Sequence, residues 1–230
     1  MLAVIIPTLN ARDSLEVLLP QLEREGAALP IIISDGGSDD GTLEYAAGKK
    51  TMTAVGSCGR GAQLARGAQW AARTQDPQWY LFLHADSRLG PDWDLAVTLH
   101  MHKYPSSAGY FRFRAHAKGW KPRLMEFCVR FRELTFGGPY GDQGLLIPRA
   151  LYEACGGYAP IPLFEDVMLI DAVKSKGDLR RLSANLYTDV SAYERCGYWA
   201  RTQRNLGLLR AFRRGEDLQR LHKAYQEPCE

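Results

Sequence analysis

The sequence predicts an α/β domain whose central sheet is mostly parallel and flanked by helices. Three short apolar runs, at residues 2–6, 31–33 and 80–83, are continuous rather than alternating, which is typical of strands buried on both faces. Helical patterns separate these runs, so strand and helix alternate through about the first 85 residues. In such a sheet, ligands bind at the carboxyl ends of the strands.

The other elements follow in order along the chain. One helix is predicted by Leu15, Leu18, Leu19 and Leu22 on a single face, and Pro20 should kink it or end it early. A weaker strand is predicted at residues 52–55. Further helices are predicted at 42–50, 60–73, 149–155, from 164 to a stop at Gly177, and from 198 onward as one or two basic amphipathic helices.

The middle of the chain, residues 104–140, is aromatic and basic, and Gly137–Gly141 reads as a loop. Its aromatic side chains either shape an acceptor pocket or belong to the core; the four we considered are Tyr110, Phe111, Trp120 and Tyr140. No repeat, low-complexity tract or linker is visible, so one domain is the simplest organisation.

The composition excludes several classes. A net charge of +3 is too small to indicate nucleic-acid binding. No stretch approaches the roughly 20 apolar residues of a membrane span. The five cysteines are scattered singly, which argues against a disulfide framework and a zinc site and favours a reduced, cytoplasmic setting. The beginning, MLAVIIPTLNARD, has no basic segment before its apolar run and is interpreted as a strand rather than a signal peptide.

Polar residues follow the first two strands. Pro7, Thr8 and Leu9 close the first strand, either as an ordinary turn or as backbone facing a nucleotide base. Asp35 ends the second strand, where its carboxylate could accept hydrogen bonds from a base or ribose, or could belong to a helix-capping turn. Arg60 and Gln63 open a helix after Gly59, a position that favours anions, although such glycine pairs are usually just loops.

Two acidic positions are the strongest candidates for chemistry. His84, Ala85 and Asp86 follow the strand at 80–83; Asp86 either holds a divalent cation together with substrate phosphates or caps the next helix. Glu165 and Asp166 begin a later helix, where acids are favoured by the helix dipole but could also supply a general base.

The arginines of the carboxyl-terminal segment have three interpretations. Arg201, Arg204, Arg210, Arg213 and Arg214 alternate with Leu206, Leu209 and Phe212. They form a solvated face over a core stripe, or a membrane-surface helix, or a group that includes Arg201 and Arg204 and neutralises a diphosphate.

The order of these motifs resembles the family 2 glycosyltransferases over roughly residues 1–215. The matching segments are PTLN, IIISDGGSDDGT, GRGAQLARGAQ, YLFLHADS, GDQGLLIPRALYEACGGY, FEDVML and RTQRNLG. The HADS form resembles a small soluble bacterial subgroup, some of whose members are associated with arsenosugar biosynthesis. The resemblance implies a GT-A fold with a Rossmann-like sheet, a nucleotide-sugar donor, a Mg2+ or Mn2+ ion and inversion at the anomeric carbon.

Residue by residue, the resemblance implies that Asp86 binds the metal and Asp166, with Glu165 beside it, is the catalytic base. Gln203 and Arg204 match a segment that contacts the donor diphosphate. The sequence departs from the pattern at three positions: His84 replaces an aspartate, Gly36 replaces an acid, and Asn205 stands where a tryptophan is usual.

We therefore expect an inverting glycosyltransferase that uses a nucleotide sugar, with UDP-sugars favoured, and a small-molecule or lipid-linked hydroxyl acceptor. The domain should span 1–215, with a nucleotide-binding half at 1–100, an acceptor-binding half at 101–200, and a basic helical segment at 201–230. Peripheral contact of that segment with the inner membrane surface is an option. The alternatives are a nucleotidyltransferase that makes a nucleotide sugar and a non-catalytic nucleotide-sugar-binding protein.

Overall fold

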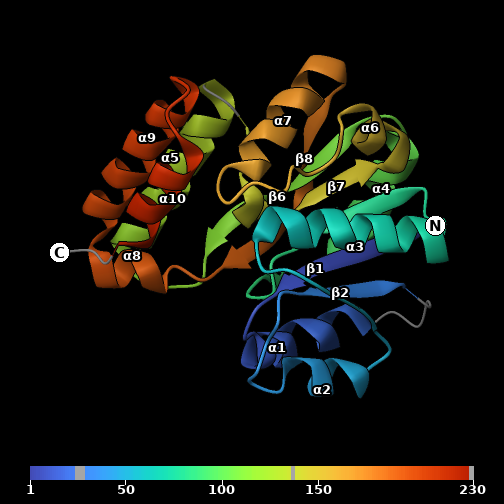
Figure 1. Cartoon of the computed structure of the whole chain (residues 1–230). Helices are drawn as coiled ribbons and strands as arrows, with labels where there is room; N and C mark the ends of the chain where they lie inside the picture. The colour runs from blue at the N-terminus through green and yellow to red at the C-terminus, as the bar shows by residue number, and fades with distance from the viewer. Residues whose placement is uncertain (24–28, 136–137, 228–230) are drawn as a thin grey trace.

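The computed structural model describes residues 1–23, 29–135 and 138–227 and has a single α/β domain (Figure 1). Its sheet has eight strands in the order β3-β2-β1-β4-β7-β6-β8-β5. The strands are β1 (Leu2–Thr8), β2 (Ile31–Asp35), β3 (Met52–Val55), β4 (Trp79–Phe82), β5 (Arg88–Leu89), β6 (Ala108–Ala115), β7 (Leu145–Pro148) and β8 (Leu179–Thr188).

The first half of the sheet is parallel, as predicted. Strands β3, β2, β1 and β4 pair in parallel, whereas β7 pairs antiparallel with β4 and β6. Strand β8 pairs parallel with β6 and antiparallel with β5. The carboxyl ends of β2, β1 and β4 therefore meet at one edge of the sheet.

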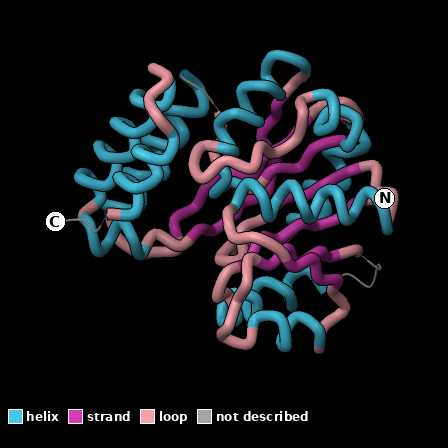
Figure 2. The backbone as a smooth tube through the Cα atoms, viewed as in Figure 1, coloured by secondary structure: helices cyan, strands magenta, loops and turns pink. Residues whose placement is uncertain are grey.

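Helices cover both faces of this sheet, and Figure 2 shows them on either side of the strands. They are α1 (Arg12–Leu22), α2 (Thr42–Ala47), α3 (Arg60–Thr74), α4 (Trp93–Lys103), α5 (Trp120–Thr135), α6 (Arg149–Ala154), α7 (Glu165–Lys176), α8 (Ser191–Cys196), α9 (Tyr198–Arg213) and α10 (Leu218–Gln226).

Strand β1 shows how the sequence builds two cores. Val4 and Ile6 join the cluster that contains helices α1 and α4, whereas Ala3 and Ile5 join the cluster that contains α3, α6 and α7. Successive side chains of a strand point to opposite faces, so a continuous apolar run serves both layers. Accordingly, α1 and α3 lie on opposite sides of β1 and β2 in Figure 1.

The carboxyl-terminal helices form a separate group with α5 at one side of the sheet (Figure 1). Leu208 and Ala211 of α9 pack with Leu221 of α10 and with Leu163, and Phe212 packs against this cluster. Part of the apolar surface of α9 thus packs against α10, which favours the core interpretation for Phe212, whereas Leu206 and Leu209 are partly buried and lie outside this cluster. Within the described residues, no helix is both long and apolar enough to cross a bilayer.

Two sequence expectations need correction. Pro20 does not end α1, since the helix continues to Leu22. The expectation that the cysteines lack disulfides is wrong for Cys196, which is disulfide-bonded, whereas Cys58, Cys128 and Cys155 are free. The predicted cytoplasmic setting loses the support that it took from reduced cysteines.

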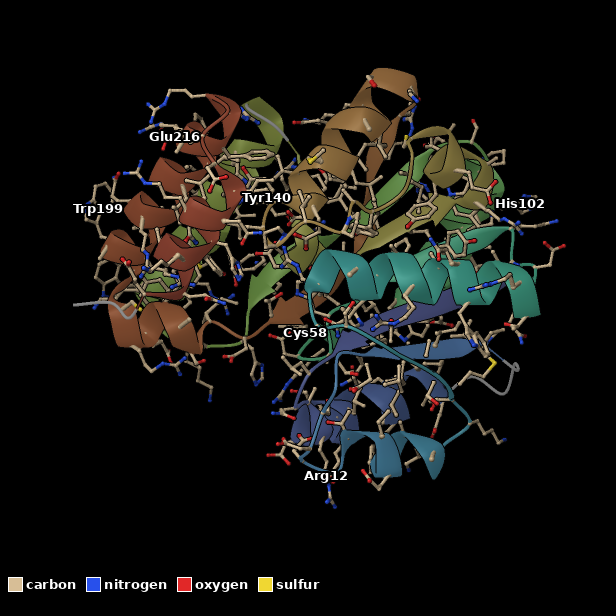
Figure 3. All side chains as sticks on the ribbon, viewed as in Figure 1. Arg12, Cys58, His102, Tyr140, Trp199 and Glu216 are labelled. Carbon is tan, nitrogen blue, oxygen red and sulfur yellow. The ribbon has the colours of Figure 1, made fainter. Side chains whose placement is uncertain are left out.

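The aromatic middle segment divides between core and surface. Tyr110 and Phe111 are buried in β6, so the core interpretation holds for them. Trp120 begins α5 and is 71% exposed. Tyr140 lies between α7 and the carboxyl-terminal helices in Figure 3, with the guanidinium of Arg132 3.8 Å from its ring centroid. Of the predicted glycine-rich loop, residue 137 lies outside the described residues.

Candidate active site

The candidate site is organised around Arg60, the first residue of α3. Its Nε donates to Oε1 of Glu165, and its terminal nitrogen lies 3.6 Å from Oδ2 of Asp166. Burial opposes the charge of Arg60, but Asp166 and Glu165 outweigh it and raise the pKa of the guanidinium. Residues about 100 positions apart in the sequence are thus joined in one charged group.

Gly61 allows this close approach of α3 to the segment that leads into α7. A Cβ added at Gly61 would collide with the carbonyl oxygen of Ala159 and come within 3.1 Å of Cβ of Glu165. Gly59, at φ 132°, turns the chain into the helix. Packing therefore requires a glycine at position 61 and the backbone conformation favours one at position 59, so the pair is more than a loop.

Helix α7 presents Glu165 and Asp166 in its first turn. The preceding residue, Phe164, is held in the left-handed region at φ 66° and stacks on Phe212 of α9, with ring centroids 4.8 Å apart. Positive φ at a bulky residue is unusual and costs conformational energy, and such residues concentrate at functional sites. Packing from α9 thus sets the direction in which α7 begins.

Asp166 is fixed by two backbone donors. Its Oδ2 accepts from the N–H of Gly141 at 2.7 Å, and its Oδ1 accepts from the N–H of Val167 at 2.8 Å. Its residue is 9% exposed, whereas Glu165 is only 1% exposed and is bound to Arg60. Asp166 is therefore the one of the two acids with some access to solvent.

His84 lies beside Asp166 at the end of β4. Both side chains, with Arg60, line a small cavity of ≈ 10 Å³. Burial lowers the pKa of His84 to about 3; the charge of Arg60 adds to this effect and Asp166 opposes it. The imidazole is neutral at any ordinary pH and can donate or accept a hydrogen bond without contributing charge.

Asp86 follows His84 and reaches solvent. The N-cap of α4 is Asp92, so the alternative in which Asp86 caps that helix is wrong. Protein around Asp86 removes part of its water and raises its pKa; its own backbone N–H opposes this, the carboxylate of Asp189 adds to it, and Arg60 lowers it. Arg60 thus acts electrostatically on both Asp86 and Asp166.

The ends of β1 and β2 are joined by a dense set of hydrogen bonds around Asp35. Thr8 Oγ1 and Ser38 Oγ donate to its Oδ1, and the N–H groups of Gly37 and Ser38 donate to its Oδ2. Burial alone would raise the pKa of Asp35, but these bonds outweigh it and lower the pKa. Asp35 is fully buried in this arrangement, so its structural role is clear.

Gln63 connects α3 to the same strand ends. Its Nε2 donates to the carbonyl oxygens of Thr8 at 2.6 Å and Ser34 at 3.1 Å, and its Oε1 accepts from the N–H of Gly59. These bonds place the beginning of α3 over the edge where β1 and β2 end. The side-chain groups of Gln63 are engaged by backbone, so we describe it as a positioning residue rather than a donor-binding one.

The remaining sequence candidates are spread more widely. Pro7 is half-buried and Ala85 is buried, whereas Leu9 is 48% exposed beyond the end of β1. Gln203 is exposed on α9. Arg204 donates to the carbonyl oxygens of Ala224 and Glu227 at the end of α10, so its guanidinium caps a helix and the diphosphate role predicted for it is not carried further.

Sequence reasoning missed the short 3₁₀ turn Gly141–Gln143. Gly141 holds Asp166, and Oδ1 of Asp142 is buried without a hydrogen-bond partner in the part of the chain that the structure describes. Burial raises the pKa of Asp142; Arg132 opposes this and Asp166 reinforces it. The composition of the GPYGDQG segment indicates a loop. It does not indicate that this loop contacts Asp166.

The site residues fit a divalent cation only in part. Among the described residues, no group of three or more histidine, cysteine or acidic side chains converges as a cation site. Asp86 is an exposed carboxylate beyond a strand end, and magnesium is commonly held by one or two carboxylates together with substrate phosphates. The donor set therefore fits a cation that arrives with a phosphate ligand.

Comparison with known proteins agrees with this architecture. The structure superposes on a crystal structure of S. aureus TarS 1-349 in complex with UDP-GlcNAc with a TM-score of 0.60 and 15% identity, covering 82% of this chain and 58% of that one. The complex of TarS 1-349 with UDP superposes with a TM-score of 0.60 and 15% identity, covering 82% of this chain and 60% of that one. The structure of GalNAc-T7 with UDP, GalNAc and Mn2+ superposes with a TM-score of 0.62 and 14% identity, covering 82% of this chain and 44% of that one.

At these identities the likeness shows the fold alone, and the chain spans about 60% of the length of the TarS 1-349 structure or less. No curated protein matches the chain. The family model described as Glycosyl transferase family 2 matches residues 3–154, which is more than half of the 230 residues. This chain therefore belongs to glycosyl transferase family 2.

Proposed function

We propose that this chain transfers a sugar from a nucleotide-diphosphate donor to a hydroxyl acceptor with inversion at the anomeric carbon. The observation that supports this best is the group of Arg60, His84, Glu165 and Asp166, which α3, α7 and the end of β4 bring to one edge of the sheet. This edge lies where parallel strands end, the usual place for nucleotides in α/β folds.

Asp166 acts as the general base. Its backbone bonds to Gly141 and Val167 fix the carboxylate direction, so the reacting oxygen does not depend on a mobile side chain. It accepts the proton of the acceptor hydroxyl as that oxygen attacks the anomeric carbon from the side opposite the diphosphate. Glu165 does not meet the acceptor; it orients Arg60 through their ion pair.

The donor lies along the ends of β1, β2 and β4. Thr8 and Asp35 shape the turn against which the base packs, with Pro7 and Leu9 beside them. His84 contributes a neutral hydrogen-bonding group to the ribose or sugar, and Ala85 leaves room next to it. Arg60, rather than Arg204, offsets the charge that grows on the leaving diphosphate, an effect typically worth several kcal/mol of barrier.

Asp86 would hold a Mg2+ or Mn2+ ion together with the donor phosphates. Such an ion supplies additional positive charge next to the leaving group. Because His84 brings no negative charge, the protein's own contribution to cation affinity is a single carboxylate, and donor and ion should bind together.

The donor and setting remain proposals of the same kind. UDP-sugars are favoured because the TarS and GalNAc-T7 structures contain UDP or UDP-GlcNAc. The acceptor is a small molecule or a lipid-linked hydroxyl compound, and nucleic acid is not a partner. A cytoplasmic setting is part of the proposal, although Cys196 is disulfide-bonded.

The test is an assay of turnover with a panel of UDP-, GDP- and dTDP-sugars. Turnover is measured as the release of the nucleoside diphosphate, with and without Mn2+. Asp166→Asn should lower turnover roughly 10²- to 10⁴-fold and leave donor affinity nearly unchanged. Asp171→Asn, an exposed acid on the same helix, is the matched control and should behave like wild type. Strong residual transfer by Asp166→Asn would refute the role of the base.

Two further measurements separate the alternative functions. Release of pyrophosphate from a nucleoside triphosphate and a sugar phosphate would identify a nucleotidyltransferase. Donor binding without any turnover would identify a binding protein. Either result would contradict the proposed transfer reaction.

A further inference from the structure

A second, larger cavity lies between α5 and strands β6 and β8, and it shares no lining residue with the Arg60–Asp166 group. Its volume is ≈ 360 Å³. Five arginines and two glutamates are among its lining residues, so three positive charges remain after each acid is matched with one arginine. The arginines are Arg112, Arg114, Arg123, Arg130 and Arg181.

The two glutamates leave these arginines incompletely paired. Glu126 binds Arg114 at 2.6 Å and Arg123 at 2.8 Å. Glu133 lies 3.2 Å from Arg130 and 3.7 Å from Arg181, and it also accepts from the amide of Gln143. Each carboxylate is therefore shared by two guanidinium groups.

Among the residues that the structure describes, no carboxylate pairs with the guanidinium of Arg112. No ion pair or hydrogen bond joins its side chain to any other residue that the structure describes, and its Nε is buried without an acceptor. A buried donor left unsatisfied costs free energy that a ligand oxygen would recover. Burial lowers the pKa of Arg181, the charges of Arg130 and Arg112 add to this effect, and Glu133 opposes it.

The chemistry of this cavity fits a phosphate group. Guanidinium groups bind phosphate through paired, charge-assisted hydrogen bonds, and arginine is preferred over lysine where such bonds are directional. The positive excess excludes cationic ligands and disfavours neutral ones. The cavity is also far larger than the ≈ 10 Å³ space beside Asp166.

An exposed apolar stripe on α5 borders the cavity. Trp120, Leu124 and Phe127 are 71%, 52% and 67% exposed and are spaced three or four residues apart, which places them on one helix face. Phe127 belongs to both the stripe and the cavity lining. A helix with exposed aromatic and leucine side chains beside arginines is typical of segments that lie in the headgroup region of a membrane.

We propose that α5 docks this chain on an anionic lipid surface, with a lipid phosphate in the arginine cavity and the Trp120–Leu124–Phe127 stripe below the headgroups. Charge complementarity and the shared residue Phe127 select a lipid over other occupants. We place the membrane contact on this surface rather than on the carboxyl-terminal helix, because Leu208, Ala211 and Phe212 of α9 already pack with α10. The docking does not depend on sugar transfer.

The test is co-sedimentation of the full chain with vesicles of phosphatidylcholine alone or mixed with phosphatidylglycerol. Binding should require phosphatidylglycerol and weaken as salt is added. Arg112→Gln should weaken it about fivefold, because one basic residue near an anionic surface contributes about that factor. Arg73→Gln, an exposed arginine at the other end of α3, removes the same charge and should change binding little.

The apolar stripe is tested in the same way. Phe127→Ser should weaken binding to the anionic vesicles about tenfold, whereas Leu99→Ser, at a position on α4 that is 57% exposed, should not. Thermal unfolding of each variant checks that it folds, and Arg112→Gln removes no native partner, so it should unfold like wild type.

Four results would overturn the proposal. Equal binding to both vesicle types would show that the chain does not recognise an anionic lipid. Identical behaviour of Arg112→Gln and Arg73→Gln would show that the arginine cavity is not the binding site. Inorganic phosphate that binds in an Arg112-dependent manner without any vesicle binding would make the ligand a free phosphate. A dimer in solution that Phe127→Ser converts to a monomer, without vesicle binding, would make the occupant of the stripe a second copy.

Discussion

The neutral state of His84 predicts a specific dependence of stability on pH. Its pKa falls from 6.5 in the unfolded chain to about 3 in the folded chain. Below pH 6.5 the unfolded state therefore binds a proton that the folded state refuses, and the free energy of unfolding decreases as the pH falls until it reaches about 3. Above pH 6.5 both states are neutral and the term disappears.

The size of the effect follows from the two pKa values. One pKa unit corresponds to about 1.4 kcal/mol, so lowering the pH from neutral to about 4.5 should cost roughly 2–3 kcal/mol through His84 alone. Replacing it by glutamine, which is polar and does not titrate, should remove this loss. Urea unfolding of wild type and His84→Gln at both pH values gives the difference directly.

Comparison of the two proteins isolates the imidazole. The carboxylates with shifted pKa values, such as Asp35 and Asp142, titrate in both and largely cancel in the difference. If wild type and His84→Gln lose the same free energy of unfolding between the two pH values, His84 is not held neutral by burial and by Arg60. The proposal of a neutral hydrogen-bonding group for the donor would then fail.

Three further predictions concern neighbouring residues. Gly61→Ala should destabilise by about 1–3 kcal/mol, because the new Cβ meets the backbone beneath α3, whereas Gly207→Ala, in open space on α9, should stabilise by about 0.5–1 kcal/mol; thermal unfolding measures both. Arg60→Gln leaves Glu165 buried without its cation and should cost about 2–4 kcal/mol, and unchanged stability in urea would contradict the central role given to this ion pair. Asp86→Ala should remove the increase in donor affinity produced by Mn2+, as measured by calorimetric titration; a retained increase would place the ion elsewhere.

The parallel half of the fold was predictable because its signals are local. Strand β3 has the predicted bounds, Met52–Val55, and the predicted helices near 60–73 and 149–155 agree with α3 and α6 within a residue. Continuous apolar runs separated by helical patterns are sufficient to predict these strands and helices. Helix α1 continues past Pro20 for two more residues, although Pro20 has no N–H to donate to the preceding turn.

The middle of the chain was not predictable for a physical reason. Helix α5 (Trp120–Thr135) exposes apolar side chains, so its pattern is not that of a helix with a polar outer face. Strand β8 (Leu179–Thr188) places its more buried residues at alternate positions, but it contains two arginines, a serine, an alanine and an asparagine, which weakens the strand signal.

Sequence reasoning selected candidate site residues at the ends of strands but did not select those in the loop at Gly141 and Asp142. His84, which follows β4, and Asp166, in the first turn of α7, line one cavity. The sequence pattern placed each residue at the end of an element but did not show that the two side chains meet. The contacts of Arg204 were not predictable because its partners, the carbonyl oxygens at the end of α10, are known only once α9 and α10 pack together. Gly141 and Asp142 were missed because a turn sequence does not reveal which carboxylate its backbone will bind.

A crystal structure of Asp166→Asn with a UDP-sugar and Mn2+ would test most directly whether Asp86 and Asp166 serve one donor. The expected result is an ion bound by the carboxylate of Asp86 and the diphosphate, with the anomeric carbon facing position 166. A donor bound away from the ends of β1 and β4, or positions 86 and 166 opening into separate cavities, would contradict the proposed mechanism.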